Sequence, residues 1–122
     1  MRIAVAEDDR EVRELIAAPL RERGFDVLEA MDGASLLAML RRSSVDLVIT
    51  DLRMPSLTGT DVVATRRREG DHTPVVFVTG APQHAIELVR PLEHVTVLRK
   101  PFTEDKLLGA VERALGIRTA EP

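Results

Sequence analysis

A chain of 122 residues is long enough for one domain with a hydrophobic core of its own. Its composition, 44% hydrophobic and 30% charged residues with a net charge of −3, is ordinary for a globular protein and gives no basis for a nucleic-acid-binding face. The lack of cysteine excludes disulfides and thiolate metal sites, and no apolar run is long enough to cross a membrane. We therefore expect a cytoplasmic domain over residues 1–117, followed by a frayed tail over residues 118–122.

The chain opens with an apolar run at 3–6 that predicts a buried strand. Asp8 and Glu11 are spaced for a capping box at the start of the helix that should follow, and Gly24 marks its end. Pro19 lies inside this helix and predicts a kink. The apolar residues of the helix recur at helical spacing: Val12, Leu15, Ile16 and Leu20.

Four more apolar runs, rich in Val and Ile, lie at 25–30, 45–50, 74–79 and 95–99. Further helical stripes comprise Leu36, Leu37 and Leu40, and then Leu107, Leu108, Val111 and Leu115. Thr103 is placed to cap the last helix, and Pro82 and Pro91 predict that the fourth helix is brief. Continuous apolar runs that alternate with amphipathic helices are typical of an α/β fold, here a doubly wound parallel sheet of five strands flanked by five helices.

Polar side chains follow several of these runs where the strands should end. The first run leads to Glu7, Asp8 and Asp9, the third to Asp51, the fourth to Thr79 and the fifth to Lys100. In an open parallel sheet, ligands bind at the carboxyl ends of the strands, where the strand order reverses. With the common order 2-1-3-4-5, the first and third strands are neighbours at that point, so we expect Asp8 and Asp51 to meet.

Converging carboxylates repel one another unless a cation lies among them, and a few oxygen ligands without His or Cys suit Mg²⁺. An aspartate can act as a nucleophile and form an acyl phosphate, and Asp51 is the best placed to do so. A hydroxyl from Thr79 and an ammonium from Lys100 would hold the phosphoryl oxygens, since phosphoryl transfer depends mainly on positioning and charge. All but two of the 17 basic residues are arginine, which favours a specific need for an ammonium at Lys100.

Each of these residues also has a structural explanation. Asp8 or Asp9 can cap the first helix, and Asp51 can belong to the turn before Pro55. Thr79 and Lys100 can be an ordinary strand end and a surface lysine. The functional interpretation rests on the fact that all of these residues follow strands and should lie at the same edge of the sheet.

The chain resembles the receiver domain of two-component response regulators, the CheY-like family with a flavodoxin-like fold, over essentially its whole length. The matching stretches are "VAEDD", "VDLVITDLRMPSLTG", "VVFVTG" and "RKPF". The resemblance implies that Asp51 accepts a phosphoryl group from the phosphohistidine of a histidine kinase or a histidine phosphotransfer protein. It also implies that Mg²⁺ is held by Asp8, Asp51 and the backbone carbonyl of Arg53, with Glu7 acting through water.

Thr79 and Lys100 would bind the phosphoryl oxygens, and Lys100-Pro101 is expected to be a cis peptide. The chain departs from the family pattern at Val97, where a Tyr or Phe commonly takes part in switching. Arg53 and Gly80 are placed to tune the lifetime of the phosphate, in opposite directions. The family resemblance also implies that a downstream protein meets the surface of the fourth helix, fifth strand and last helix.

We expect a signalling domain that catalyses only its own phosphorylation and dephosphorylation, as a monomer or weak dimer, with no nucleic acid or membrane partner. It is either a single-domain regulator or a receiver from a larger regulator or hybrid kinase. The rival function is a Mg²⁺-dependent aspartyl-phosphate phosphohydrolase of the haloacid-dehalogenase type, which would need a second Asp where Arg53 stands. A third alternative is a receiver-like domain that binds partners without phosphorylation. The segment "RRRE" at 66–69 is interpreted as a solvated helix end, and His72, His84 and His94 as surface residues.

Overall fold

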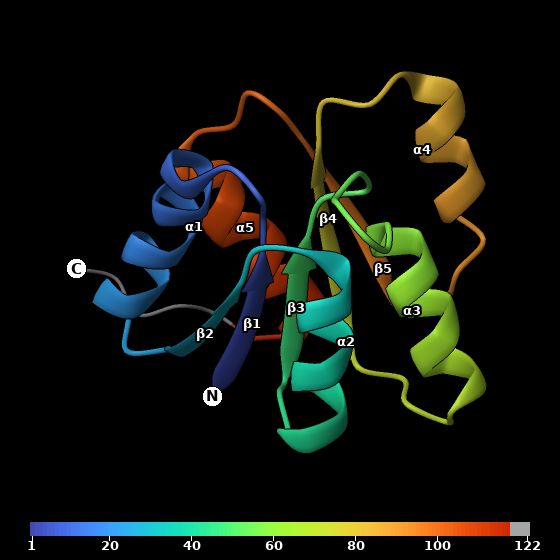
Figure 1. The fold of residues 1–122 in the computed structure, drawn as a ribbon. Helices are drawn as coiled ribbons and strands as arrows, with labels where there is room; N and C mark the ends of the chain where they lie inside the picture. The colour runs from blue at the N-terminus through green and yellow to red at the C-terminus, as the bar shows by residue number, and fades with distance from the viewer. Residues whose placement is uncertain (118–122) are drawn as a thin grey trace.

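The computed structural model describes residues 1–117; the predicted frayed tail, 118–122, lies outside the described residues. Strands and helices alternate along the chain, as the sequence predicts (Figure 1). The elements are β1 (Arg2–Ala6), α1 (Arg10–Glu22), β2 (Asp26–Ala30), α2 (Gly33–Arg42), β3 (Leu47–Thr50), α3 (Gly59–Arg68), β4 (Val75–Thr79), α4 (Gln83–Val89), β5 (Val95–Arg99) and α5 (Glu104–Leu115).

The strands form one parallel sheet in the order β2-β1-β3-β4-β5, which confirms the predicted fold class and strand order. β1 lies between β2 and β3, with Ile3 opposite both Val27 and Leu47. The chain therefore runs outward from β1 in two directions, first to β2 and then to β3. The loops that leave β1 and β3 diverge to opposite faces at this point, and the residues that follow these two strands come together there.

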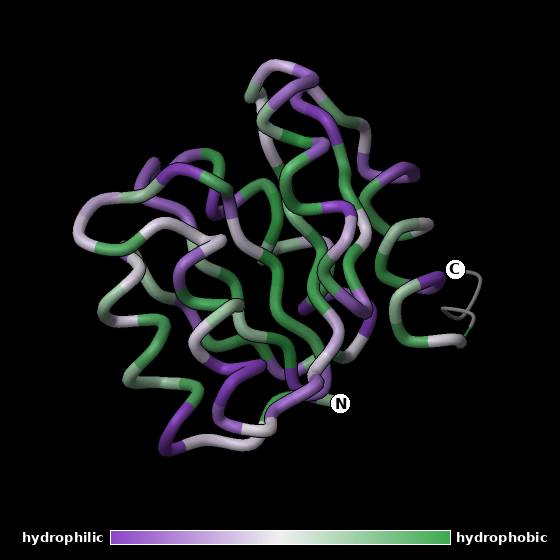
Figure 2. The backbone as a smooth tube through the Cα atoms, turned by 90° about the vertical axis from the view of Figure 1, so that its right-hand side faces the viewer, coloured by the Kyte–Doolittle hydropathy of each residue, from purple (hydrophilic) through white to green (hydrophobic). Residues whose placement is uncertain are grey.

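The sheet separates two hydrophobic clusters, because successive side chains of a strand point to opposite faces. Ile3 and Val5 of β1 pack in the cluster under α1 and α5, whereas Ala4 and Ala6 pack in the cluster under α2, α3 and α4. Figure 1 shows these two helical layers on either side of the strands. In Figure 2 the strands run as hydrophobic segments through the middle of the molecule. Burial on both faces explains why the inner strands β1, β3 and β4 read as continuous apolar runs.

The ends of α1 and α5 are set by local hydrogen bonds. Asp9 caps α1, because its Oδ1 accepts from the N–H groups of Glu11 at 2.9 Å and Val12 at 3.2 Å. The predicted capping box at Asp8 is therefore wrong, and the Asp8 side chain is exposed. Thr103 caps α5 as predicted, through its side-chain oxygen and the N–H of Lys106 at 3.2 Å.

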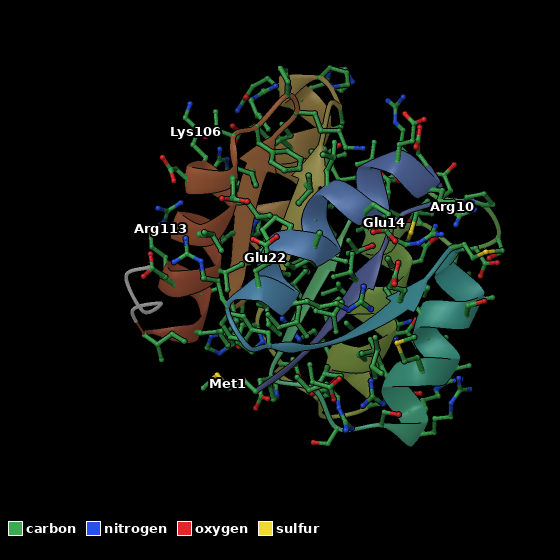
Figure 3. All side chains as sticks on the ribbon, turned by 90° about the vertical axis from the view of Figure 1, so that its left-hand side faces the viewer. Met1, Arg10, Glu14, Glu22, Lys106 and Arg113 are labelled. Atoms are coloured by element: carbon green, nitrogen blue, oxygen red, sulfur yellow. The ribbon has the colours of Figure 1, made fainter. Side chains whose placement is uncertain are left out.

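The lengths of α1 and α4 agree with the sequence-based expectation. α1 contains Pro19 and continues to Glu22, and Gly24 follows with a φ of 89° that suits a glycine. Leu15, which shares the helical spacing of Ile16 and Leu20, is 65% exposed, whereas those two residues are buried. α4 is only seven residues long, which confirms that this helix is brief. The outer faces of α1 and α5 carry charged side chains, including Arg10, Glu14, Glu22, Lys106 and Arg113 (Figure 3).

The basic segment at the end of α3 was predicted to be a solvated helix end, but two of its arginines are partly buried and paired. Arg66 is only 19% exposed and forms ion pairs with Glu69 and Asp71 at 2.9 and 3.1 Å. Arg67 donates to the backbone carbonyls of Asp71 and Glu93, so it ties the end of α3 to the loop before β5. The three histidines, His72, His84 and His94, are exposed as predicted. Within residues 1–117, no helix combines the length and the apolar character needed to cross a membrane.

Candidate functional site

The carboxyl ends of β1, β3 and β5 bring two carboxylates and one ammonium into direct contact. The Nζ of Lys100, which follows β5, donates to Glu7 Oε1 at 2.6 Å and to Asp51 Oδ2 at 2.8 Å. Glu7 directly follows β1 and Asp51 directly follows β3. The three residues come from segments far apart in the sequence, so the fold alone creates this contact. The predicted convergence at this edge is present for these residues.

The three charges differ in how deeply they are buried. Glu7 is 1% exposed, the Asp51 side chain 12% and the Lys100 side chain 27%. Burial is the main cause of a raised pKa at Glu7; Asp8 and Asp51 add to it, and Lys100 opposes it. Burial alone would lower the pKa of Lys100, but the hydrogen bonds and charges of Asp51 and Glu7 outweigh it and raise that pKa. Lys100 therefore keeps its positive charge between the two carboxyl groups.

One oxygen of this cluster has no partner in the described structure. Glu7 Oε2 is buried and makes no hydrogen bond within residues 1–117. Asp8, the next residue, has an exposed side chain, and Asp9 is occupied in capping α1. In the part of the chain that the structure describes, no three side chains of His, Cys, Asp or Glu form a metal-binding group. The edge thus offers a small set of oxygen atoms rather than a complete cage.

Asp51 is held by the backbone of the loop that follows it. The N–H of Arg53 donates to Asp51 Oδ1 at 3.2 Å, while the Arg53 side chain is exposed. The start of α3 packs directly on this loop, because the N–H of Gly59 donates to the carbonyl of Leu52 at 3.1 Å. A Cβ at Gly59 would stand only 2.0 Å from the Asp51 carbonyl oxygen, so only glycine allows this approach.

Thr79 lies at the end of β4, between the strands that lead to Asp51 and Lys100. The N–H of Lys100 donates to the Thr79 carbonyl at 2.9 Å, so the two backbones are in contact. The Thr79 hydroxyl is 1% exposed and accepts from the N–H of Ala81 at 3.0 Å. The Lys100-Pro101 peptide is cis, which confirms that expectation.

Two arginines near the site make contacts that were not predicted. Arg13 of α1 donates from Nη1 to the Glu7 carbonyl at 2.8 Å, and Arg99 of β5 donates to the Ala81 carbonyl and to the side chain of Gln83. Neither arginine belongs to a recognisable sequence motif. Their hydrogen-bond partners depend on how α1 and the loop after β4 fold back onto the site. Val97, which stands where the family commonly has an aromatic residue, is half-buried and packs against the cluster under α2, α3 and α4.

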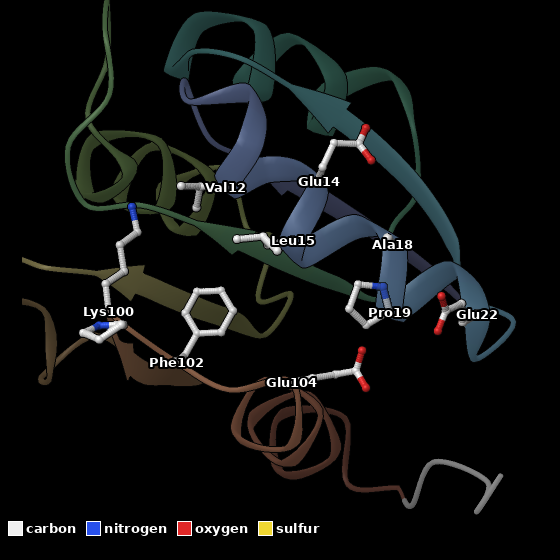
Figure 4. Close-up of a pocket in the computed structure, with 10 residues that line it drawn as sticks. Val12, Glu14, Leu15, Ala18, Pro19, Glu22, Lys100, Phe102 and Glu104 are labelled. Carbon is white, nitrogen blue, oxygen red and sulfur yellow. The ribbon is translucent and has the colours of Figure 1, made fainter.

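A groove of about 590 Å³ begins at Lys100 and runs along α1 (Figure 4). Its floor and walls are apolar, formed by Val12, Leu15, Ala18, Pro19, Pro101 and Phe102. Glu14, Glu22 and Glu104 line its outer parts and are exposed. The exposed Leu15 therefore belongs to an apolar surface with an acidic rim.

The structure thus combines an open, parallel α/β sheet with the acidic pair Glu7 and Asp8, a central Asp51 and Lys100 at its switch point. The chain matches the family described as response regulator receiver domain over residues 3–112. It is 37% identical over 121 residues to response regulator MprA of Mycobacterium leprae, an alignment that covers 98% of this chain and 52% of that protein. It is 33% identical over 113 residues to transcriptional regulatory protein DltR of Streptococcus agalactiae, covering 91% and 50%.

Solved structures agree with these relatives. The chemotaxis response regulator CheY4 of Vibrio cholerae has a TM-score of 0.86 at 26% identity, covering 93% of this chain and 98% of that one. The receiver domain of the Francisella response regulator 1452 has a TM-score of 0.85 at 25% identity, covering 94% and 96%. The chain belongs to the response regulator receiver domain family and is a signalling domain of two-component systems. It spans about half the length of the two curated relatives described above.

Proposed function

We propose that Asp51 accepts a phosphoryl group from the phosphohistidine of a histidine kinase or a histidine phosphotransfer protein. In this transfer the N–P bond of the phosphohistidine breaks and a bond forms between phosphorus and a carboxylate oxygen of Asp51. The other ring nitrogen of the histidine carries a proton taken from solvent, so the leaving group is a neutral imidazole. The observation that carries the proposal is the contact of one ammonium, on Lys100, with both Asp51 and Glu7 at 2.8 and 2.6 Å.

Mg²⁺ is the proposed cofactor, and the residues present fit it. Glu7 Oε2, which is buried and accepts no hydrogen bond within residues 1–117, and the exposed Asp8 beside it supply oxygen atoms. Mg²⁺ is commonly held by one or two carboxylates with several waters. Asp8, Asp51 and the backbone carbonyl of Arg53 would hold the ion, with Glu7 acting through water. When bound, the ion would neutralise charge on the phosphoryl oxygens.

The other site residues act on the phosphoryl group in this proposal. The Lys100 ammonium already donates to Asp51 Oδ2, so it is placed to donate to an oxygen of a phosphoryl group on that carboxylate. The Thr79 hydroxyl makes one bond as an acceptor, to the Ala81 N–H, and keeps its proton to donate. With Val97 in place of an aromatic residue, movement of Thr79 and the loop after it carries the switching step. Arg53 and Gly80 tune how fast water reaches the acyl phosphate.

The domain turns over no external substrate in this proposal and catalyses only its own phosphorylation and dephosphorylation. The rival phosphohydrolase is not favoured, because it needs a second carboxylate two residues after the nucleophile and Arg53 stands there. The streptococcal relative is named a transcriptional regulatory protein, and the chain covers half of it. Three expectations remain predictions: this chain itself binds no nucleic acid, it acts as a monomer or weak dimer, and it meets a downstream protein through α4, β5 and α5.

The groove beside Lys100 is the proposed docking surface for the phosphodonor protein. It starts at the residue that contacts Asp51, so a partner seated in it lies next to the acceptor. The apolar floor and the acidic rim of Glu14, Glu22 and Glu104 favour a helix with an apolar face flanked by basic side chains.

The direct test is labelling with a small acyl phosphate and Mg²⁺, followed by intact mass and by phosphate release. The wild-type chain should gain one acid-labile phosphoryl group, and Asp51→Asn should gain none. Sustained release of phosphate over many turnovers would support the phosphohydrolase instead. Labelling of the Asp51→Asn variant at the wild-type level would exclude Asp51 as the acceptor, and no labelling of the wild type would favour the receiver-like domain that only binds partners.

A further inference from the structure

Arg13 contacts the backbone of the acidic pair, and the proposed mechanism does not use it. Its Nη1 donates to the Glu7 carbonyl at 2.8 Å, and its Nε donates to Glu29 Oε1 of β2 at 3.0 Å. The Arg13 side chain is only 14% exposed, although it lies on the first turns of a surface helix. Two charged hydrogen bonds on one largely buried guanidinium hold it in a single orientation.

The bond to the Glu7 carbonyl affects Asp8 as well. The carbonyl of Glu7 and the N–H of Asp8 belong to one peptide plane, which is rigid. The N–H of Glu7 is also fixed, because it donates to the Ala30 carbonyl at 3.1 Å. Arg13 therefore restrains the plane that sets the directions of both acidic side chains, between the end of β1 and the start of α1.

We infer that Arg13 is a positioning residue for the Mg²⁺ site, acting through the Glu7–Asp8 peptide, an inference that rests on the function proposed above. The ion pair with Glu29 ties this restraint to β2, the strand that supplies no site residue. Without Arg13, Asp8 would sample more directions and bind the ion less well, while Lys100 would still hold the Glu7 side chain from the other side.

Arg21 provides a matched control in the same helix. It donates from Nη2 to Glu29 Oε2 at 3.0 Å and to a backbone carbonyl, that of Val27, at 3.2 Å. Arg13 and Arg21 thus share the same carboxylate partner and each bind one carbonyl. Only the carbonyl bound by Arg13 belongs to the acidic pair.

The test compares Arg13→Met and Arg21→Met, since methionine keeps much of the apolar stem and removes the donors. Mg²⁺ affinity is measured by calorimetry, stability by thermal denaturation, and Asp51 labelling with a small acyl phosphate. Loss of a group that orients metal ligands commonly lowers affinity by about 10–100-fold, so we expect a loss in that range for Arg13→Met. Arg21→Met should stay close to wild type in affinity. Arg13→Lys, which keeps a charged donor group but not the guanidinium fork, should recover part of the loss.

Equal Mg²⁺ affinities of Arg13→Met and Arg21→Met would overturn the inference and leave the proposed function intact. A wild-type chain that neither binds Mg²⁺ nor labels would instead overturn the proposed function. A second measurement needs no variant: the Nε–H resonance of Arg13 in the wild type should shift when Mg²⁺ is added, and that of Arg21 should not. An Arg13 signal that is unchanged at saturating Mg²⁺ would also contradict the positioning role.

Discussion

Replacing Gly59 by alanine tests whether the start of α3 holds in place the loop after β3, which carries the proposed acceptor Asp51 and is called the acceptor loop below. A Cβ at this position would stand 2.0 Å from the Asp51 carbonyl oxygen and 3.1 Å from Cε1 of Phe77, whereas real Cβ contacts are essentially never below 3.0 Å. The nearest obstacle is backbone rather than the end of a flexible side chain. Either α3 or the acceptor loop must therefore move when the methyl group is added.

The magnitude follows from two opposing effects. Overpacking of this kind typically costs about 1–3 kcal/mol, and alanine in place of glycine returns about 0.4–1 kcal/mol by restricting the unfolded chain. We expect the free energy of unfolding to fall by roughly 1–2 kcal/mol. Because a displacement of about 1 Å at a reacting group can lower a rate by about 100-fold, labelling of Asp51 should slow by a much larger factor than the fraction of folded protein changes.

Urea denaturation followed by circular dichroism and a labelling time course measure the two effects. Gly109→Ala is the control: its Cβ would meet only Nη1 of Arg113, at 3.4 Å, inside the helix α5. There alanine should stabilise the protein by about 1 kcal/mol and leave labelling unchanged. If Gly59→Ala keeps both the stability and the labelling rate of the wild type, the close approach of α3 to Asp51 is no constraint on the site and the reasoning fails.

Three further changes give distinct outcomes. Lys100→Arg should label more slowly with a small acyl phosphate, because a planar fork cannot replace the compact ammonium between Glu7 and Asp51; a wild-type labelling rate would contradict this. Leu15→Asp should slow phosphotransfer by about tenfold when the donor is a histidine kinase that labels the wild type. Its labelling by a small acyl phosphate should be unchanged. Leu88→Asp, at a residue 77% exposed on α4, is its control, and equal transfer rates for the two variants would remove the groove as the docking surface. The pKa of Glu29 is lowered: burial would raise it, but the hydrogen bonds and charges of Arg21 and Arg13 prevail. The ionised Glu29 therefore contributes stability above its unfolded pKa, and this contribution is lost as the pH falls through its folded pKa. Glu29→Gln should flatten the fall of the free energy of unfolding with pH below about pH 4.5. An unchanged slope would refute the assignment of this pH dependence to Glu29.

The sheet and most of the site were predictable because they depend on the order of elements. The inner strands β1, β3 and β4 are buried on both faces and so must be largely apolar, which made them visible as runs. Parallel strands also present their carboxyl ends at one edge. Glu7, Asp51 and Lys100 follow three such strands, and the structure places their side chains in contact. The meeting of these three residues could be predicted without knowing the conformation of the loops.

What the sequence left open depends on loop geometry and on the angle of each helix. Asp8 and Asp9 are chemically the same, and only the path of the chain after β1 decides that Asp9 caps α1 and leaves Asp8 exposed. Leu15 shares the helical spacing of the buried stripe, but α1 sits so that this side chain faces the groove. The bond from Arg13 to the Glu7 carbonyl joins residues from two elements and leaves no pattern in the sequence.

The balance of charge at this edge gives a physical reason for an acidic pair beside the proposed acceptor Asp51. Lys100 is the ammonium that contacts Glu7 and Asp51, and Asp8 adds a further acidic group next to them. A phosphoryl group on Asp51 replaces one negative charge with about two, so the single ammonium would then face a larger excess of negative charge. A divalent cation held by Asp8 and Asp51, as proposed, would offset that excess. In the proposed function, Glu7 and Asp8 would therefore help to hold the ion, and the ion would add to Lys100 the positive charge that the phosphoryl group needs.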